Sequence, residues 1–471
     1  MHSTRQTSPR PCGSTCLNRV EYALNSYCLP LPGVIDSEPS NPLESSPLNP
    51  LQFKDLLISF TSEFLPLWND KGSGAHRAIG LWRPSTSSDA LSQFFPLGDT
   101  ATDSYRNINQ SKIVAVVSDA NKVDGTALRM PDDYELVWTE TNSGARTPVS
   151  IWRPIAPEGY IAMGEVCGIN YEKPARSAMR CVRVDLVTSA RVGESIWSDK
   201  GSGAAKDFSA WSITAKDTSP GEINLAPGTF IGSQRYSRPN LPVYSLCLTL
   251  AAQINEPLPP PALTSYESPA SGETPPMIQV CPLPWFSVID PDLNAVEQLQ
   301  SSPTYRLERT DRHFFIGFGH NREATPQPTM WTATKGETGR QSKALLATTG
   351  IDLQKVWPIY VPQSHLSFSA NLEQHFTHTQ RSAKGWNYAS PLEIITYIPA
   401  NMAVAAYLIQ SEYRLLRQDG SQVSATVTFT NGDQVYMSEF PGAVPERIEA
   451  PVVEPASEVT GHDPVDNTLA P

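Results

Sequence analysis

Apolar and polar residues alternate along much of the chain, and this pattern predicts β-strands. Residues 79–82 read Ile-Gly-Leu-Trp, and the alternation returns as Val-Ser-Ile-Trp at 149–152 and as Phe-Ser-Ala-Trp at 208–211. A period of two residues places successive side chains on opposite faces of a strand. Residues 290–300 form the one helix candidate, because Asp290 suits an N-cap and Pro291 the first turn. The pattern therefore favours an all-β fold.

One segment of the chain occurs three times. A seven-residue stretch that begins with tryptophan and ends with Ser-Gly is repeated, and a second tryptophan always follows 14 residues after the first. Repeats at a fixed spacing indicate that one supersecondary unit has been triplicated. The tryptophan pairs are Trp68 and Trp82, Trp138 and Trp152, and Trp197 and Trp211.

Each copy opens with a predicted β-hairpin. Its turn carries Gly72 in the first copy and Gly201 in the third, and Asn142 stands at the same place in the second. Glycine and asparagine adopt the positive φ of tight hairpin turns most readily. The acidic residue two positions earlier either accepts hydrogen bonds from turn amides or binds calcium or a sugar hydroxyl. The second tryptophan forms either a platform for a sugar or headgroup or part of the core. The candidate ligand-binding residues are Asp70, Glu140, Asp199, Trp82, Trp152 and Trp211.

Two further strands are predicted after the hairpin in each copy. The third strand is expected at 95–99, 160–165 and 229–232, and the fourth at 112–118, 179–186 and 243–248. Each copy would then be a four-stranded antiparallel sheet, which is too small to bury one face alone. We therefore expect a triplicated β-prism-like domain of three four-stranded antiparallel sheets that share one axis. A three-bladed propeller and a β-trefoil are the alternatives.

Proline-rich and acidic stretches divide the chain. Residues 256–277 hold seven prolines and predict a semi-rigid linker, and residues 441–471 hold six acidic residues and one arginine and predict a disordered tail. The predicted organisation is a disordered segment at 1–54, the repeat domain at 55–252, the linker at 253–277, an elongated antiparallel β domain at 278–440 and the acidic tail at 441–471.

Long amphipathic strands rich in Ser and Thr are predicted in the elongated domain. Hairpin turns are expected at Asp419-Gly420 and at Asn431-Gly432. The run 365–377 alternates over more than the ~9–11 residues that a membrane-spanning β-strand needs. It is interpreted either as a sandwich strand with one solvated face or as a membrane-insertion strand. In the second case the lipid-facing side chains would be Leu366, Phe368, Ala370, Leu372 and Phe376.

Composition narrows the classes of function. Lys and Arg number 36 against 48 Asp and Glu, which gives a net charge of −12, and no basic run is present. A nucleic-acid partner is therefore not expected, because phosphate binding needs a basic face. No stretch approaches the ~20 apolar residues of a transmembrane helix, and no classical signal peptide is found. We expect a protein that is cytoplasmic or exported without such a signal. Its seven cysteines, an odd number, favour free thiols.

Two resemblances follow from particular strings. The segments Gly159-Tyr-Ile-Ala-Met-Gly-Glu and Cys181-Val-Arg-Val-Asp-Leu-Val are similar to the vacuolar protein sorting-associated protein sixty-two family, over roughly residues 55–250. This resemblance implies a link to sorting or adaptor binding and no catalytic residue. The strings Pro303-Thr-Tyr-Arg-Leu-Glu-Arg and Ala347-Thr-Thr-Gly-Ile, and residues 398–420, look like segments of insecticidal and aerolysin-type β-pore-forming toxins.

No catalytic motif is present. Gly72-Ser73-Gly74 lacks the form of a nucleophile elbow, and residues 201–206 lack the ending of a phosphate-binding loop. We expect no enzyme, metal or cofactor. The sequence predicts a membrane- or glycan-binding protein that resembles pore-forming toxins and forms homo-oligomers on membranes. Its partner would be a glycan, a lipid headgroup or a membrane protein. The alternative is an intracellular vacuolar sorting or trafficking adaptor that binds protein or lipid without inserting.

Overall fold

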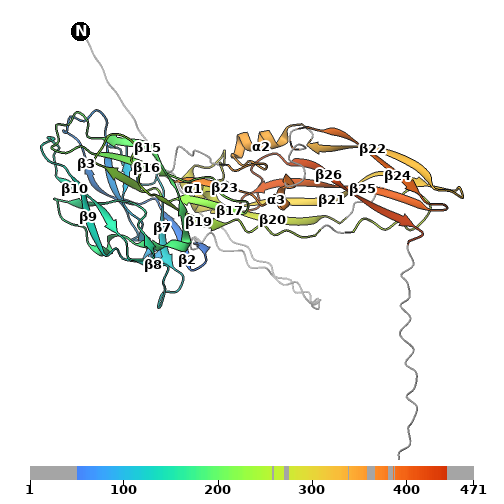
Figure 1. Ribbon diagram of the computed structural model, residues 1–471, viewed down its shortest axis with the longest axis horizontal. Helices are drawn as coiled ribbons and strands as arrows, with labels where there is room; N and C mark the ends of the chain where they lie inside the picture. The colour runs from blue at the N-terminus through green and yellow to red at the C-terminus, as the bar shows by residue number, and fades with distance from the viewer. Residues whose placement is uncertain are drawn as a thin grey trace, which may run out of the picture. The chain divides into compact units, whose positions relative to one another are not determined.

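The computed structural model describes residues 50–256, 259–269, 275–337, 339–357, 366–379, 386 and 388–442. These residues belong to the structural unit Pro47–Pro471. Strands hold 46% of the residues and helices 9%, and the strand pairs are antiparallel, so the all-β prediction is confirmed. Figure 1 shows the repeats in blue to green and the later strands in yellow to red.

Each repeat contributes one three-stranded sheet built on its predicted hairpin. The central strand of each sheet carries the second tryptophan of the repeat and pairs with the strand that carries the first. The three sheets have the orders β3-β4-β6, β9-β10-β12 and β15-β16-β18. Their strands are β3 (Phe64–Asn69), β4 (Gly80–Pro84), β6 (Thr100–Thr102), β9 (Asp133–Thr139), β10 (Val149–Ile155), β12 (Val166–Ile169), β15 (Arg191–Ser198), β16 (Ser209–Thr214) and β18 (Phe230–Ser233).

The other strands of the repeats form a second set of sheets. Their orders are β1-β2-β7-β5, β11-β13-β8 and β14-β19-β17-β23. The strands are β1 (Leu51–Phe53), β2 (Leu56–Thr61), β5 (Phe95–Pro96), β7 (Val114–Asp119), β8 (Leu128–Arg129), β11 (Tyr160–Ile161), β13 (Cys181–Arg183), β14 (Val187–Ser189), β17 (Glu222–Ala226), β19 (Tyr244–Thr249) and β23 (Ser367–Asn371). Strand β1 lies within the predicted disordered segment 1–54, whose residues 1–49 lie outside the described residues.

The prediction of one four-stranded sheet per repeat is wrong, because the predicted third strand crosses between two sheets. In the first repeat only β5 lies within the predicted range 95–99, the chain enters another sheet at β6 directly after it, and Gly98 with φ of 150° lies between the two strands. A Cβ atom on Gly98 would lie 3.0 Å from Gly164 Cα, and one on Gly164 would lie 2.5 Å from Thr229 Cβ. The three crossing segments therefore approach one another too closely for larger residues.

The hairpin turns are as predicted. Gly72 and Gly201 have φ of 93° and 94°, and Asn142 has φ of 64° at the equivalent position. This is the left-handed region, which β-branched and bulky residues avoid because Cβ meets the following carbonyl oxygen.

The first tryptophans of the three repeats pack against one another. The ring centroids of Trp68, Trp138 and Trp197 lie 6.2–6.4 Å apart, and the rings meet edge to face. All three side chains are buried in one hydrophobic cluster. Edge-to-face packing places the positive ring edge against the negative face of its neighbour.

The indole N–H groups close a ring around this cluster. Trp68 Nε1 donates to the Thr147 carbonyl of the second repeat at 2.7 Å, and Trp138 Nε1 donates to the Lys206 carbonyl of the third repeat at 2.9 Å. Trp197 Nε1 donates to the Arg77 carbonyl of the first repeat at 2.8 Å. Each acceptor lies five residues before the second tryptophan of its repeat, so the three contacts are equivalent.

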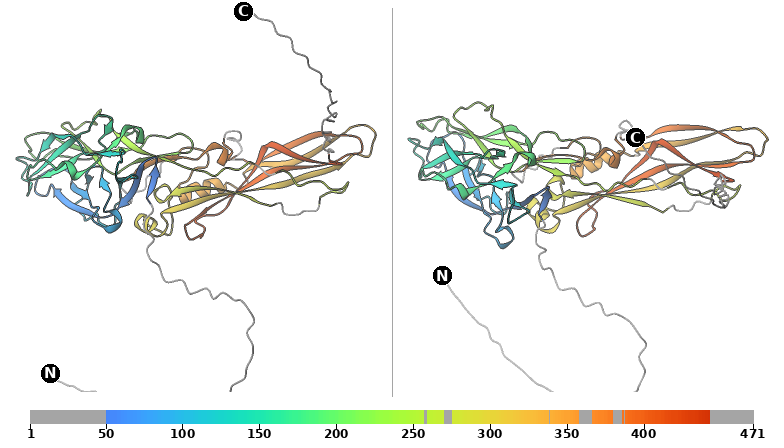
Figure 2. Two further views of the ribbon diagram at one scale, coloured as in Figure 1. Left: turned by 90° about the horizontal axis from the view of Figure 1, so that it is seen from below. Right: turned by 60° about the horizontal axis from the view of Figure 1, so that its bottom comes forward.

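A six-stranded sheet of the order β20-β21-β25-β26-β22-β24 follows the repeats. Its strands are β20 (Met277–Pro284), β21 (Thr304–His320), β22 (Gln327–Glu337), β24 (Ser390–Ile398), β25 (Ala403–Leu416) and β26 (Val427–Phe440). Long strands are therefore present, as expected, and Figure 2 shows them side by side in yellow to red. The turn at Asp419-Gly420 is confirmed by φ of 86° at Gly420. The turn at Asn431-Gly432 is wrong, because these residues lie inside β26, where the pairing with β25 is interrupted.

The helices that the structure describes are short, and the first of them begins later than the helix predicted at 290–300. They are α1 (Ala295–Ser301), α2 (Gln341–Thr349) and α3 (Gln374–Thr377), with 3-10 turns at Asp89–Leu91, Arg176–Ala178, Val184–Leu186 and Trp285–Ser287. Helix α1 starts later than predicted because Asn294 and Glu297 form its capping box. Asp290 instead forms an ion pair with Arg417, with Arg417 Nε 2.7 Å from Asp290 Oδ2.

The predicted membrane-insertion strand is not a continuous strand. β23 ends at Asn371, and Phe376 lies in helix α3. β23 pairs with β17 of the third repeat, so its backbone completes a sheet of the repeat domain. The apolar side chains that would face lipid are all buried in the largest hydrophobic cluster: Leu366, Phe368, Ala370, Leu372 and Phe376.

Part of the predicted linker packs on the six-stranded sheet. Leu263 is buried against Tyr407, and its N–H donates to Ser438 Oγ at 2.8 Å. The ring of Tyr266 stacks on His320 with centroids 4.6 Å apart. The acidic tail falls outside the described residues beyond residue 442.

Candidate functional site

Three hairpin loops meet at one end of the repeat domain. They comprise residues 70–78, 140–148 and 199–207 and are called here the hairpin apex. The loops are joined by a second closed ring, made of backbone hydrogen bonds. His76 N donates to Lys200 O at 3.2 Å, Arg146 N to Lys71 O at 3.3 Å, and Ala205 N to Thr141 O at 3.1 Å. The apex is therefore one surface to which every repeat contributes.

The acidic residues of the turns point into the protein. Asp70, Glu140 and Asp199 are 2%, 5% and 3% exposed. Asp70 Oδ1 accepts from Ile79 N at 3.0 Å, and Asp199 Oδ1 accepts from Phe208 N at 2.9 Å. Burial raises the pKa of Asp199, which the hydrogen bond from Phe208 N–H opposes.

Of the two interpretations of these acidic residues, turn capping agrees with the contacts. Glu140 accepts from the hydroxyl and N–H of Ser143. Each carboxylate thus holds its own turn, and none is offered to a ligand at the surface.

The second tryptophans also pack inside the repeats. Trp82 and Trp211 are 8% and 6% exposed, and Trp152 is half-buried. Their indole N–H groups bond to hydroxyls within the same sheet, such as Trp82 Nε1 to Thr102 Oγ1 at 3.2 Å and Trp211 Nε1 to Ser209 Oγ at 2.7 Å. Burial of this kind agrees with the core interpretation rather than with a surface platform.

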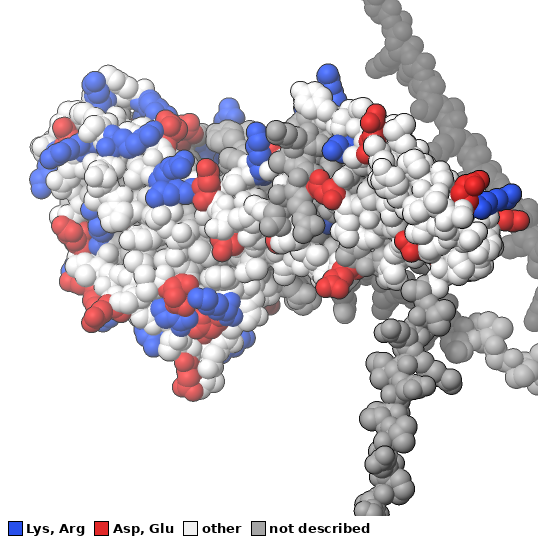
Figure 3. Space-filling model, turned by 45° about the vertical axis from the view of Figure 1, so that its right-hand side comes forward, with Lys and Arg blue, Asp and Glu red and all other residues white. Residues whose placement is uncertain are grey.

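The exposed side chains of the apex are mostly basic. Five cations stand in its loops, and the one exposed carboxylate, Asp207, accepts a hydrogen bond from the Tyr236 hydroxyl at 2.9 Å. The formal charge of these exposed groups is +4, although the chain carries −12. In Figure 3, several Lys and Arg side chains lie along the upper left of the repeat domain, with Asp and Glu side chains among them. The five cations are Lys71, Arg77, Arg146, Lys200 and Lys206.

Glycines keep the backbone of the apex tightly packed beneath these cations. A Cβ atom on Gly72 would lie 2.9 Å from Gly144 O, and one on Gly144 would lie 3.1 Å from Gly72 O. The close approach of the loops brings cations from all three repeats onto one small area. Because those cations are far apart in the sequence, no basic run reveals them.

Buried ion pairs connect consecutive repeats below the apex. Arg83 binds Asp99 through two hydrogen bonds of 2.8 Å and also donates to Cys167 O of the second repeat at 3.0 Å. Arg153 binds Glu165 at 2.8 Å and donates to Gly232 O of the third repeat at 2.9 Å. Burial raises the pKa of Glu165, which Arg153 opposes.

The third repeat has no such pair. Ser212 follows Trp211 at the position where the other two repeats have arginine. Phe230 stands at the position of the acidic residue, because it directly precedes Ile231, which pairs with Trp211. The arginine and the acid are thus both replaced in the same repeat.

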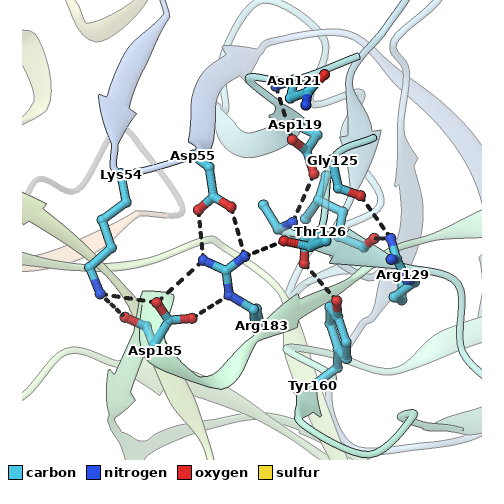
Figure 4. Close-up of polar contacts among 12 residues, drawn as sticks. Lys54, Asp55, Asp119, Asn121, Gly125, Thr126, Arg129, Tyr160, Arg183 and Asp185 are labelled. Carbon is cyan, nitrogen blue, oxygen red and sulfur yellow. Dashed lines mark hydrogen bonds and ion pairs between the residues drawn. The ribbon is translucent and has the colours of Figure 1, made fainter. Parts of the chain in front are cut away.

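A surface network surrounds Arg183, in the string that carried the family resemblance (Figure 4). Arg183 forms two hydrogen bonds with Asp55, of 2.7 and 2.8 Å, and two with Asp185, of 2.5 and 3.3 Å. Lys54 lies 3.0 Å from Asp185. Arg183 holds the pKa of Asp185 at about 2. These contacts join the turn between β1 and β2, which carries Lys54 and Asp55, to Arg183 and Asp185 of the second repeat. The four residues therefore have a structural role.

Among the described residues, the cysteines and helices add no further site. The described cysteines Cys167, Cys181, Cys247 and Cys281 are free thiols. Burial raises the pKa of Cys281 to about 12, so this thiol stays protonated. None of the described helices has the length and apolar character needed to cross a membrane.

These features define an all-β protein with a triplicated unit and a basic surface at one end of it. The model of the family "Vacuolar protein sorting-associated protein 62" matches residues 46–257, so the predicted resemblance is confirmed. No curated protein matches the chain significantly.

Two solved structures show partial likeness. GNIP1Aa from Chromobacterium piscinae is 27% identical with a TM-score of 0.34, and the match covers 40% of this chain and 34% of that one. This chain thus spans about a third of the length of GNIP1Aa. The Bacillus protein Cry35Ab1 is 12% identical with a TM-score of 0.30, and the match covers 83% of this chain and 91% of that one. Both are insecticidal toxins, the class that the C-terminal strings resemble. At these TM-scores the likeness does not establish a common fold.

Proposed function

We propose that this chain is a non-enzymatic protein that binds anionic membrane surfaces through the hairpin apex. The observation that carries this proposal is the set of five exposed cations on three loops joined by a closed hydrogen-bonded ring. The proposal keeps the predicted lipid-headgroup partner and moves the binding residues from the buried acids to the neighbouring basic side chains.

A prism-like arrangement of the three repeat sheets is part of this proposal. Two closed rings of equivalent contacts, one of indole N–H groups and one of backbone amides, support approximate threefold symmetry. Such symmetry brings three equivalent loops to one end, where cations of every repeat face the same direction.

The expected strength follows from the number of cations. Each Lys or Arg close to an anionic bilayer contributes about 1 kcal/mol, so five contribute about 5 kcal/mol. This corresponds to a preference of roughly 10³- to 10⁴-fold for an anionic over a neutral bilayer. The attraction is electrostatic and weakens as salt shortens the Debye length. It requires no calcium.

Vesicle sedimentation of the full chain tests the proposal. Vesicles of phosphatidylcholine alone are compared with vesicles that contain about one third phosphatidylserine, at low and at high salt. The test variant combines Lys71→Glu, Arg146→Glu and Lys200→Glu. Its matched control carries the same change of charge at exposed sites elsewhere, Lys122→Glu, Arg191→Glu and Lys343→Glu.

We expect the chain to bind the anionic vesicles only, with binding lost in the apex variant and weakened no more than about threefold in the control. Equal loss in both variants would show a general charge effect and contradict the apex. Calcein release from the same vesicles separates docking from pore formation. Failure to bind any vesicle would favour the adaptor that recognises a protein.

A further inference from the structure

Three tyrosines lie beside the hairpin apex, one in each repeat. Each follows the last strand of its repeat's hairpin sheet by two or three residues. That strand ends opposite the residue that opens the central strand, so the tyrosines stand at the same end of each sheet as the apex loop. The cations of the apex are a separate set of residues. The tyrosines are Tyr105, Tyr171 and Tyr236.

The hydroxyl group of each tyrosine is held by the apex loop of its own repeat. Tyr171 donates to the carbonyl of Glu140 at 2.6 Å, and Tyr236 donates to Asp207 Oδ1 at 2.9 Å. The hydroxyl of Tyr105 lies close to the turn carboxylate of the first repeat, and partial burial together with this carboxylate raises the pKa of Tyr105 to about 12. Each ring therefore has a fixed position beside its loop.

The three tyrosines are exposed to nearly the same extent, 42%, 44% and 40%. Single exposed aromatic residues are ordinary on a protein surface. Three at equivalent places around one end of a triplicated domain form a repeated feature instead. Tyrosine is enriched at membrane–water interfaces, because its ring enters the apolar boundary while its hydroxyl stays among polar groups.

Tyr171 has a backbone conformation that large side chains rarely adopt. Its φ is 64°, and the preceding residue, Asn170, has φ of 52°. In this left-handed region Cβ approaches the following carbonyl oxygen, so a bulky residue is strained there. Strained residues of this kind cluster at functional sites. The second repeat thus keeps a tyrosine where glycine or asparagine would relieve the strain.

Cations lie next to the tyrosine rings. Lys71 Nζ is 5.0 Å from the ring centroid of Tyr105, and the exposed Arg106 and Arg235 adjoin Tyr105 and Tyr236 in the chain. An anionic bilayer offers both partners at once, negative headgroups for the cations and an apolar boundary for the rings. A dissolved anion offers only the charge. The combination of groups therefore fits a bilayer surface better than a free anion.

We infer that Tyr105, Tyr171 and Tyr236 enter the interface of an anionic bilayer and anchor the hairpin apex there. The inference rests on the proposed function, because it concerns the lipid contacts of the same surface. Cations and rings contribute differently to such binding. The attraction of the cations weakens as salt rises, whereas the contribution of the rings comes from apolar area removed from water and persists.

Vesicle binding of the full chain over a series of salt concentrations tests the inference. The vesicles contain phosphatidylcholine with about one third phosphatidylserine. One variant combines Tyr105→Ser, Tyr171→Ser and Tyr236→Ser, and a second combines Tyr→Phe at the same three positions. The phenylalanine variant loses the same hydroxyl contacts but keeps the rings. The matched control combines Tyr388→Ser and Tyr397→Ser on the six-stranded sheet, where the tyrosines are more exposed.

A second measurement does not depend on removing a ring. Tyr105→Trp keeps an aromatic side chain at the apex, and phosphatidylcholine brominated close to its headgroup quenches the fluorescence of an indole that enters the interface. The unchanged chain on the same vesicles gives the contribution of the native tryptophans. Thermal unfolding establishes that each variant folds, and the quenching decides the question if the serine variant unfolds.

We expect the serine variant to bind about tenfold more weakly at every salt concentration, because roughly 20 Å² of apolar area buried on each ring gives this factor. Its dependence on salt should equal that of the unchanged chain. The phenylalanine variant and the control should bind as the unchanged chain does, and Tyr105→Trp should add quenching.

Undiminished binding of the serine variant, or no added quenching in Tyr105→Trp, overturns the inference and leaves docking by the cations intact. An equal loss in the phenylalanine variant or in the control also overturns it, because the apex rings would then not be the cause. Failure of the unchanged chain to bind these vesicles even at low salt contradicts the proposed function itself, and the inference fails with it.

Discussion

Removal of Arg153 tests whether the buried ion pairs hold consecutive repeats together. In the variant Arg153→Ser, Glu165 loses both hydrogen bonds from the guanidinium, and Gly232 O loses its donor. Glu165 is 1% exposed, and its Oε2 already has no partner within the described residues. Breaking one partner of a buried pair costs about 3–5 kcal/mol. The side chain of Arg153 is 32% exposed, so water screens part of the interaction and we expect about 3 kcal/mol.

The third repeat suggests a compensating change. It has Ser212 and Phe230 in place of the arginine and the acid, and Phe230 is fully buried. The double variant Arg153→Ser with Glu165→Leu removes the unpaired carboxylate as well. We expect this double variant to be at least about 2 kcal/mol more stable than Arg153→Ser alone, because no buried charge remains.

The pH dependence provides an independent signature. Burial holds the pKa of Glu165 above its value in the unfolded chain, and loss of Arg153 raises that pKa further. A folded-state pKa above the unfolded one means that the folded state binds the proton more tightly, so stability increases as pH falls through it. The loss of stability in Arg153→Ser, relative to the unchanged chain, should therefore become smaller between pH 7 and pH 5.

Urea unfolding followed by tryptophan fluorescence measures these differences, because the ring of Trp68, Trp138 and Trp197 reports on the repeat core. A cost below about 1 kcal/mol for Arg153→Ser, or a double variant no more stable than the single one, would refute the reasoning.

Three further predictions concern the repeats. Trp68→Phe and Trp138→Phe each remove one equivalent indole hydrogen bond to a carbonyl, so thermal unfolding should show similar losses of about 1–3 kcal/mol, and Trp197→Phe, which also loses the contact of Nε1 with Asp70 Oδ2, should cost at least as much; strongly unequal losses for the first two would argue against symmetry. Asn142→Ala should destabilise by about 1 kcal/mol and Asn142→Gly hardly at all, because φ at this turn is 64°; equal effects in urea unfolding would contradict the role of φ. Asp185, whose pKa Arg183 lowers to about 2, stabilises the fold above the unfolded-state pKa of about 4 and loses this effect as pH falls to 2. The melting temperature of Asp185→Asn should therefore fall less steeply over that range than that of the unchanged chain, and identical slopes would exclude this contribution.

The sequence located the repeats but did not reveal how their strands divide between sheets. Fixed tryptophan spacing and the exchange of Gly72 for Asn142 predicted the hairpins, because positive φ leaves a signature in residue type. The point where the chain crosses between sheets is marked in the sequence only by Gly98, and glycine occurs in many kinds of turn, so the crossing could not be predicted. The division into two sheets depends on contacts with the other repeats, which no single repeat encodes.

In the candidate site, likewise, contacts within one turn could be predicted from the sequence, whereas contacts between distant loops could not. Asp70, Glu140 and Asp199 were recognised as turn residues, and their capping contacts are local. The basic apex depends on Lys71, Arg146 and other cations that meet only through hydrogen bonds between loops about 60 to 130 residues apart in the chain.

The alternation of polar and apolar residues also led to a wrong prediction for the run 365–377, where burial of the side chains decides the structure. The run 365–377 has the period of a strand over its whole length, yet only Ser367–Asn371 is extended. Glu373 caps helix α3 by accepting from the N–H groups of His375 and Phe376, and this local contact ends the strand pattern. Both a solvated and a buried strand can alternate, so period does not distinguish a lipid-facing residue from a core residue.

The amino-acid sequence by itself determined the all-β character, the three hairpins and the turn residues, because these depend on side-chain period and on φ preferences within a few residues. Only the tertiary structure decided which faces are buried and where charges from different repeats meet. Those properties depend on contacts between residues far apart in the chain, and such contacts exist only when the sheets pack together.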